Sequence, residues 1–224
     1  MGVANEASCG FASGRGAKGY LARNAAPLLA LALFVGLVPL VGRGVTYLNL
    51  AFYAVVTVYF AALGSCPPVR WKEELAKGSF WRQTLATVGA VVAGFLLMLL
   101  LQASLPGLDL GESELPTRTP VEIALFALQT TLLPPLAEEL FFRKSLIVLG
   151  GGARTVVTVV LSLLLFALEH ALAPFGVLTY AVLGASFSIP YAWHKNVYAM
   201  MTAHLIVNVV GNGLPLAAML LLAR

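Results

Sequence analysis

The chain has 224 residues, of which 59% are hydrophobic and 11% are charged. Soluble domains carry about 25% charged residues, so this composition, with a mean hydropathy of +0.88, excludes a soluble globular protein. The net charge of +4 is small and spread over loops, which fits a membrane leaflet and not a nucleic-acid surface. The sequence predicts an all-α, polytopic helical membrane protein with membrane lipids around it and no nucleic-acid partner.

The N-terminal segment is basic, rich in Gly, Ala and Ser, and without an apolar core of its own. We expect residues 1–24 to form a flexible basic tail and not a cleaved signal peptide. An N-terminal transmembrane region, residues 25–120, then precedes a C-terminal region, residues 121–224, that carries the candidate site.

Seven apolar runs are long enough to span a membrane. They lie at about Ala25–Gly42, Val45–Gly64, Thr84–Leu105, Val121–Leu149, Thr155–Ala173, Phe175–Trp193 and Val197–Leu222. The fourth contains Pro134 and Pro135, which should kink or break its helix. Backbone groups freed by such a break survive at membrane depth only inside protein or beside a wet cavity. We therefore predict about seven transmembrane helices, with an irregular fourth.

Basic residues gather in alternate loops. The tail, the segment from Arg70 to Arg82, the surroundings of Lys144 and Arg154, and Lys195 would share one side, whereas residues 106–120 are acidic and lie on the other. This distribution predicts a cytoplasmic N-terminus. The segment from Trp71 to Trp81 is typical of an amphipathic interfacial helix. Other aromatic residues at span ends, and His194 beside them, are expected at the lipid headgroups: Tyr191 and Trp193.

Two adjacent carboxylates and an arginine lie inside the fourth apolar run. A charged group at the bilayer centre costs about 2.5–3.5 kcal/mol on insertion scales, so we expect these residues to be used. Glu139 and Arg143 are four residues apart on one helix face and can pair. Glu138 lies about 100° further around the helix, has no local cation, and is left free for chemistry.

Two later spans carry polar pairs at helical spacing. Phe166 and His170 share one face near the end of the fifth span, and His204 and Asn208 share one face of the last. A single histidine in an apolar helix is as readily structural as functional, but together with Glu138 they supply a base, a second proton-handling group and two hydrogen-bond donors. Counted from the nearest loops at about 1.5 Å per residue, His170 would lie ~22 Å deep and His204 ~12 Å, so straight helices would not bring them together. Helix tilt, the proline breaks or helices that extend past the membrane must close this gap, or the span boundaries differ from those given.

These residues resemble the three motifs, in order, of the CAAX-protease and bacteriocin-processing (CPBP) family, which includes type II CAAX prenyl endopeptidase-like intramembrane glutamate proteases. The motifs are Glu138-Glu139-x-x-x-Arg143, Phe166-x-x-x-His170 and His204-x-x-x-Asn208, and the resemblance covers roughly residues 134–208. Eukaryotic members trim prenylated CAAX proteins. The sequence departs from the family at positions where small residues are common: Lys144, Ser188 and the turn His194-Lys195-Asn196. These departures bear on substrate shape more than on the reactive groups.

The resemblance implies an intramembrane endopeptidase with its catalytic core in the C-terminal four spans, residues 121–224. Glu138 would activate a water as general base, and His170 would share or orient that water. His204 and Asn208 would donate hydrogen bonds to the oxyanion, a contribution of about 3–4 kcal/mol per donor. Glu139 and Arg143 would hold the helices together. Phe166 would either pack beside His170 or be an ordinary core residue.

Other functions are compatible with these residues. Two histidines and a glutamate also form a zinc-hydrolase ligand set, but the chain has no His-Glu-x-x-His helix and Asn208 is a poor zinc ligand. We expect no metal and no other cofactor, with zinc the less favoured alternative. A non-catalytic bacteriocin-immunity or scaffold protein is a rival, and so is a proton-coupled transporter, although no inverted repeat is visible.

The expected substrate is a membrane-associated, lipidated or small secreted peptide or protein, cleaved in a bacterial cytoplasmic membrane. Glu169 precedes His170 but points elsewhere on an ideal helix. Its carboxylate would either orient a neighbouring side chain or meet solvent at the helix end, and we favour solvent.

Overall fold

The computed structural model describes residues 17–41, 45–105, 119–170 and 174–222, which are helical apart from short turns and contain no strand. Within these residues, six segments are long and apolar enough to cross a membrane: Lys18–Val41, Val45–Ala62, Phe80–Ser104, Pro120–Ser145, Gly152–His170 and Val197–Leu221. The prediction of an all-α polytopic membrane protein is confirmed.

Short π-helical segments interrupt the α-helices in the C-terminal half of the chain. The elements in chain order are α1 (Ala17–Val41), α2 (Val45–Ala62), α3 (Pro68–Leu75), α4 (Phe80–Ser104), α5 (Pro120–Ala127), η2 (Leu128–Leu132), α6 (Leu133–Glu138), η3 (Glu139–Ser145), α7 (Gly152–His170), α8 (Pro174–His194), α9 (Val197–Asn208), η4 (Val209–Gly213) and α10 (Leu214–Leu222). The three η segments are π-helical.

Each predicted apolar run corresponds to one helical segment, and the structure differs from the prediction at α1, at α8 and in the predicted interfacial segment. Helix α1 begins at Ala17, so residues 17–24 are helical although we expected them in the tail; residues 1–16 lie outside the described residues. The sixth run forms the 21-residue helix α8, which is not among the six spanning candidates. The single interfacial helix predicted from Trp71 to Trp81 is wrong, because α3 ends at Leu75 and α4 begins at Phe80.

The start of α1 is helical because it binds the end of η3. Tyr20 Oη donates a hydrogen bond to the carbonyl of Leu146 (2.9 Å), and Arg23 Nη2 donates to that of Ser145 (2.7 Å). The hydroxyl of Ser145 in turn donates to Asn24 Oδ1 at 2.6 Å. Carbonyls at a helix end lack partners within their own helix, and here α1 supplies them.

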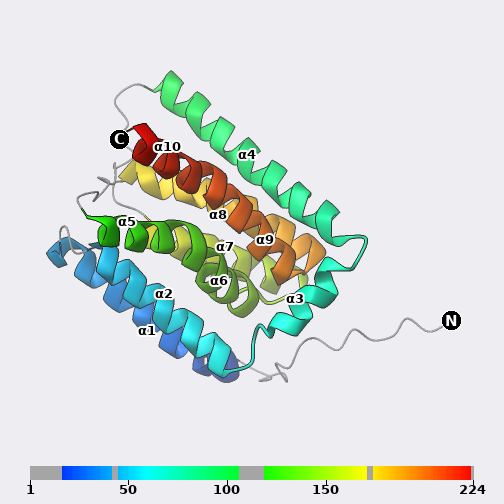
Figure 1. Ribbon diagram of the computed structural model, residues 1–224. Helices are drawn as coiled ribbons and strands as arrows, with labels where there is room; N and C mark the ends of the chain where they lie inside the picture. Colours follow the sequence, from blue (N-terminus) through cyan, green and yellow to red (C-terminus); the bar gives the residue numbers. More distant parts are fainter. Residues whose placement is uncertain (1–16, 42–44, 106–118, 171–173, 223–224) are drawn as a thin grey trace.

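The continuous segment α5–η3 runs through the middle of the bundle (Figure 1). Helices α1 and α2 pack together on one side of it, with α2 against α6, and α9 packs on the other side against α6 and η3. Helix α4 lies at the far edge against α8 and α9, and α7 packs along α8. Segment η3 is therefore enclosed by other helices, and every side chain from Glu139 to Arg143 is buried.

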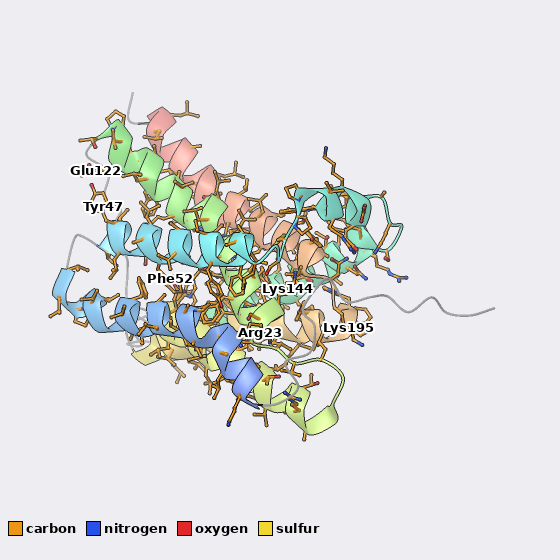
Figure 2. All side chains as sticks on the ribbon, turned by 90° about the horizontal axis from the view of Figure 1, so that it is seen from below. Arg23, Tyr47, Phe52, Glu122, Lys144 and Lys195 are labelled. Atoms are coloured by element: carbon orange, nitrogen blue, oxygen red, sulfur yellow. The ribbon has the colours of Figure 1, made fainter. Side chains whose placement is uncertain are left out.

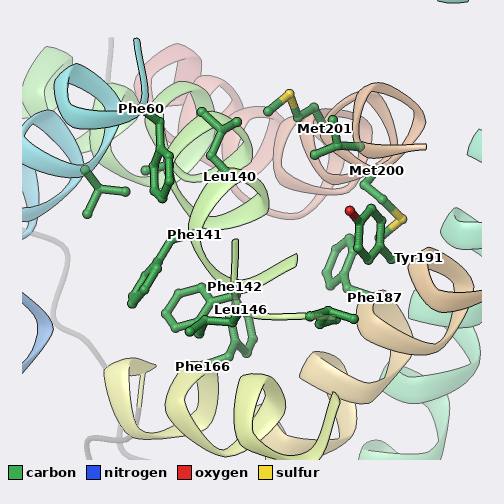
Figure 3. Close-up of a cluster of buried hydrophobic side chains, with 14 of the residues drawn as sticks. Phe60, Leu140, Phe141, Phe142, Leu146, Phe166, Phe187, Tyr191, Met200 and Met201 are labelled. Carbon is green, nitrogen blue, oxygen red and sulfur yellow. The ribbon is translucent and has the colours of Figure 1, made fainter. Parts of the chain in front are cut away.

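The predicted break at Pro134 and Pro135 takes the form of π-helix on both sides of α6. A π-helical turn leaves some backbone groups without their α-helical partners, and one of them, the carbonyl of Phe142, accepts a hydrogen bond of 2.6 Å from Ser162 Oγ of α7. Aromatic and methionine side chains fill the space around η3 (Figure 3): Phe141, Phe142, Phe166, Phe187, Met200 and Met201.

Several labelled polar residues mark the two ends of the bundle. Arg23, Lys144 and Lys195 lie toward one end, whereas Glu122 and Tyr47 lie toward the other (Figure 2). Residues 106–118 of the predicted acidic loop lie outside the described residues.

The aromatic residues expected at the headgroups divide into two groups. Trp81 and Trp193 are exposed, as expected, but Tyr191 is buried in the core, so its predicted interfacial position is wrong. Trp71 is half-buried because its indole Nε1 donates to Thr202 Oγ1 of α9 at 3.3 Å.

Candidate active site

Glu138 lies at the end of α6, almost completely buried between two imidazole rings. Its Oε1 is 3.7 Å from His170 Nε2 of α7, and its Oε2 is 3.9 Å from His204 Nε2 of α9. Neither carboxylate oxygen has a hydrogen-bond partner among the described residues. These separations exceed a direct hydrogen bond and suit one bridging water. The gap in depth counted from the loops is closed in the structure, since both imidazoles lie within 4 Å of Glu138.

Glu139 fixes the second histidine. Its Oε1 lies 2.8 Å from His204 Nδ1 in a buried contact, and a carboxylate accepts, so Nδ1 carries a proton and donates it. The same oxygen lies 3.4 Å from Arg143 Nη1, which confirms the predicted pairing. His204 Nε2 is thereby directed at Glu138.

Arg143 is fully buried in an aromatic cage. Its guanidinium carbon lies 4.4 Å from the ring centre of Phe166 and 5.1 Å from that of Phe187. Cation–π attraction and the Glu139 carboxylate together offset the cost of burying this cation. Arg143 therefore joins η3 to α7 and α8.

His170 is held between two aromatic rings. Its ring centre lies 4.4 Å from that of Phe166 and 4.5 Å from that of Tyr180 on α8, which confirms that Phe166 packs beside it. Its Nδ1 donates to the backbone carbonyl of Phe166 at 3.1 Å, leaving Nε2 toward Glu138. The side chain is 21% exposed, against 1% for Glu138. His170 therefore marks the more open side of the cluster.

Glu169 belongs to the same cluster, and the prediction that it meets solvent is wrong. Its side chain is buried, and its Oε2 contacts His170 Nδ1 directly. Tyr53 Oη of α2 donates to its Oε1 at 3.0 Å. Glu169 is the next-to-last residue of α7, and the hydrogen bond from Tyr53 keeps its side chain inside the protein. No sequence signal separates Tyr53 from the other aromatic residues of α2.

Asn208 lies one turn beyond His204 at the end of α9 and is half-buried. Within the described part of the chain, no hydrogen bond joins its side chain to Glu138 or to either imidazole. The structure thus brings together Glu138, His170 and His204 from three helices, with Asn208 further along the last.

The donor set can also be tested against a metal ion. Glu138, Glu169 and His170 each offer a ligand atom within 4.8 Å of the others, but both oxygens of Glu169 already contact Tyr53 or His170. The alternative set is Glu138 with the Nε2 atoms of His170 and His204, two imidazoles and a carboxylate, which suits zinc. That set uses the same atoms as the bridging-water arrangement.

No curated protein and no solved structure matches the chain. A family model described as type II CAAX prenyl endopeptidase Rce1-like matches residues 120–210. The match runs from the start of α5 into η4 and contains all three motifs. The chain is an integral membrane protein whose matched family is one of proteases. Residues 120–210 are therefore similar to the type II CAAX prenyl endopeptidase Rce1-like family, which the three motifs also resemble.

Proposed function

We propose that the protein is an intramembrane endopeptidase in which Glu138 activates a water to hydrolyse a peptide bond. The substrate would be a membrane-associated, lipidated or small secreted peptide. The observation that carries this proposal is the buried carboxylate of Glu138, whose oxygens have no hydrogen-bond partner among the residues that the structure describes. Two imidazole nitrogens lie 3.7 and 3.9 Å from it, within residues that match a model of a protease family.

The water would lie between Glu138 Oε1 and His170 Nε2. Because His170 Nδ1 donates to the Phe166 carbonyl, Nε2 of the neutral ring presents a lone pair, and the water can donate one hydrogen to it and the other to Glu138. Its own lone pair then attacks the substrate carbonyl carbon as Glu138 takes a proton. The C–N bond breaks when that proton passes to the amine nitrogen, leaving one carboxylic acid and one amine, with Glu138 again a carboxylate.

The oxyanion would be stabilised from α9. His204, held through Nδ1 by Glu139, directs Nε2 to the same space, and in its doubly protonated form it donates to the oxyanion. Asn208, one turn further along, would supply a second donor. Such donors commonly contribute about 3–4 kcal/mol each.

The proposal includes the setting of the reaction. We place the chain in a bacterial cytoplasmic membrane with its N-terminus in the cytoplasm, since Arg23, Lys144 and Lys195 share one end of the bundle and basic residues favour the inner side. The mechanism needs no metal.

The test uses purified protein in lipid nanodiscs with a farnesylated CAAX peptide as probe, alongside a comparison of membrane and secreted peptides from cells with and without the intact protein. We expect cleavage by the wild type and by Glu73→Ala, which removes an exposed carboxylate on α3. Glu138→Ala, His170→Ala and His204→Ala should each abolish cleavage while the proteins remain folded. Full activity in a folded Glu138→Ala variant would end the proposal.

A chelator distinguishes activation of water by Glu138 from binding of a zinc ion by Glu138, His170 and His204. Cleavage by the proposed mechanism should persist after treatment with 1,10-phenanthroline. Loss of cleavage that added zinc restores would instead assign Glu138 and the two imidazoles to a metal.

A non-catalytic role is the rival that the contacts also support, because Glu139, Arg143 and His204 tie η3 to α9. In that case, protection of cells against a bacteriocin would survive Glu138→Ala.

A further inference from the structure

Glu169 is a buried carboxylate that the mechanism above does not use. Within the described part of the chain, Glu169 contacts one basic side chain, that of His170, through Nδ1. No Lys or Arg side chain there forms an ion pair with Glu169. Burying an anion is costly unless it is paired and hydrogen-bonded. Burying the Glu169 carboxylate therefore costs stability, and its contact with His170 indicates that the carboxylate acts on that imidazole.

Each imidazole of the site has a glutamate beside Nδ1 and shares Glu138. The contact of Glu139 with His204 is a hydrogen bond, whereas Glu169 Oε2 contacts His170 Nδ1 as an ion pair while the Phe166 carbonyl takes the hydrogen bond. His204 has Glu139 on Nδ1 and Glu138 on the side of Nε2. His170 has Glu169 on Nδ1 and Glu138 on the side of Nε2. A carboxylate on one ring nitrogen sets the tautomer and the direction of the other nitrogen, so each ring is oriented by a separate glutamate toward the shared one.

Tyr53 holds Glu169 in place from another part of the chain. Its hydroxyl donates to Oε1 at 3.0 Å in a buried contact, so Oε2 is left for the imidazole. Tyr53 is on α2, outside the residues 120–210 that match the family model. The N-terminal region therefore contributes to the geometry of the site.

We infer that Glu169 is a positioning residue for hydrolysis: its carboxylate lies against Nδ1 of His170 and keeps the proton of the neutral ring on that nitrogen, so that Nε2 presents its lone pair to the water, and it is itself positioned by Tyr53. This inference rests on the proposed function for its catalytic consequence. The orientation of His170 by Glu169 does not depend on any substrate.

The kinetic test compares Glu169→Gln, Tyr53→Phe and the control Glu73→Gln on the farnesylated peptide. Removing the orienting carboxylate of a serine protease triad lowers kcat by about 10⁴-fold. Here the Phe166 carbonyl also accepts from Nδ1, so we expect a fall of about 10²-fold, with KM changed less than about twofold. Tyr53→Phe should lower kcat less and in the same way, and Glu73→Gln should leave both constants unchanged.

A spectroscopic test does not require activity. The chain has three histidines, so ¹⁵N-histidine labelling gives few ring signals, which can be assigned by single substitutions. An imidazole proton beside a carboxylate resonates far downfield. We expect that signal for His170 in the wild type and in Glu73→Gln, and its upfield movement in Glu169→Gln.

The outcomes are distinguishable. An unchanged His170 proton signal and full kcat in folded Glu169→Gln would overturn the inference while the proposed function stands. Cleavage that survives Glu138→Ala would overturn the proposed function, and the proton signal would still decide whether Glu169 orients His170. A rise in KM with kcat unchanged would assign Glu169 to substrate binding and would also overturn the inference.

Discussion

A carboxylate that takes a proton from water has to be free of other partners. Glu138 and Glu139 are adjacent, yet they lie in opposite situations: Glu139 binds His204 and Arg143, whereas both oxygens of Glu138 are without hydrogen bonds among the described residues. Helical spacing predicts this division, since residues four apart face each other and neighbours do not. In η3 the helix is π-helical, and the pairing of Glu139 with Arg143 is kept.

The buried ion pair yields a stability prediction. Arg143→Leu leaves Glu139 buried with His204 as its remaining partner and empties the cage between Phe166 and Phe187. Removing one partner of a buried pair costs about 3–5 kcal/mol, and we expect that loss in the free energy of unfolding measured by denaturant titration. Arg70→Leu, on the exposed surface of α3, should change it by less than about 0.5 kcal/mol. Equal small effects in both variants would contradict this account.

Single residues also show where the sequence stops being informative. The two imidazoles beside Glu138, those of His170 and His204, could be predicted because histidine is rare in apolar spans and therefore conspicuous in the sequence. Glu169 and Tyr53 could not, because the contact depends on how a flexible side chain bends at a helix end and on which aromatic residue of α2 faces it. Tertiary packing decides both.

At the scale of elements, the apolar runs predict the helices closely, and the prolines predict an irregular fourth span. The sequence does not predict that the irregularity is π-helical, because that depends on partners such as Ser162, which accommodates the displaced carbonyl of Phe142. The separation of α3 from α4 was missed for a similar reason. The Trp71 indole donates a hydrogen bond to Thr202 of α9, and helical periodicity within one segment cannot predict a contact with a distant helix.

The contact between α7 and α8 depends on Gly184. A Cβ at this position would lie 3.1 Å from Cδ1 of Phe166 and 3.4 Å from the backbone Cα of Leu163. Phe166 is buried and touches both Arg143 and His170, so it cannot move without disturbing the site. We expect Gly184→Ala to cost about 1–3 kcal/mol in the free energy of unfolding and to lower kcat on the farnesylated peptide.

The matched control is Gly89→Ala in α4, where no atom lies within 4 Å of the added Cβ. This variant should match the wild type within about 0.5 kcal/mol and retain its kcat. If both substitutions behave alike, the close approach at Gly184 is not what positions Phe166.

The turn between α8 and α9 yields a pH prediction. His194 ends α8, outside the six spanning segments, and its Nδ1 accepts from the backbone N–H of Asn196 at 3.2 Å. Asn196 caps α9 by accepting from the N–H groups of Tyr198 and Ala199. Burial lowers the pKa of His194 below its ordinary value of 6.5, because the charged ring loses hydration.

The unfolded chain therefore binds the proton at a higher pH than the folded chain. The contribution of His194 to stability is complete above about pH 6.5 and is lost as the pH falls through the lowered pKa of the folded state. We expect the free energy of unfolding to fall between about pH 7 and about pH 5, and to fall less in His194→Gln. An equal fall in both proteins would show that His194 does not titrate in this way.

For the molecule as a whole, contacts join the helices before residue 120 to the residues that match the family model. Tyr20 and Arg23 of α1 bind the end of η3, and Tyr53 of α2 reaches Glu169. The motifs single out the residues that lie together in the C-terminal region, Glu138, His170 and His204. They do not predict that the N-terminal helices hold those residues in place, because such contacts join residues far apart in the chain.

The central claim is that Glu138 holds one water between two imidazoles supplied by separate helices. The most direct measurement is a crystal structure from a lipidic mesophase at a resolution that shows ordered water. We predict a water within about 3 Å of both Glu138 Oε1 and His170 Nε2, with His204 Nε2 on the other side of the carboxylate. A Glu138 side chain that faces acyl chains, or a metal ion bound in place of the water, would contradict the account.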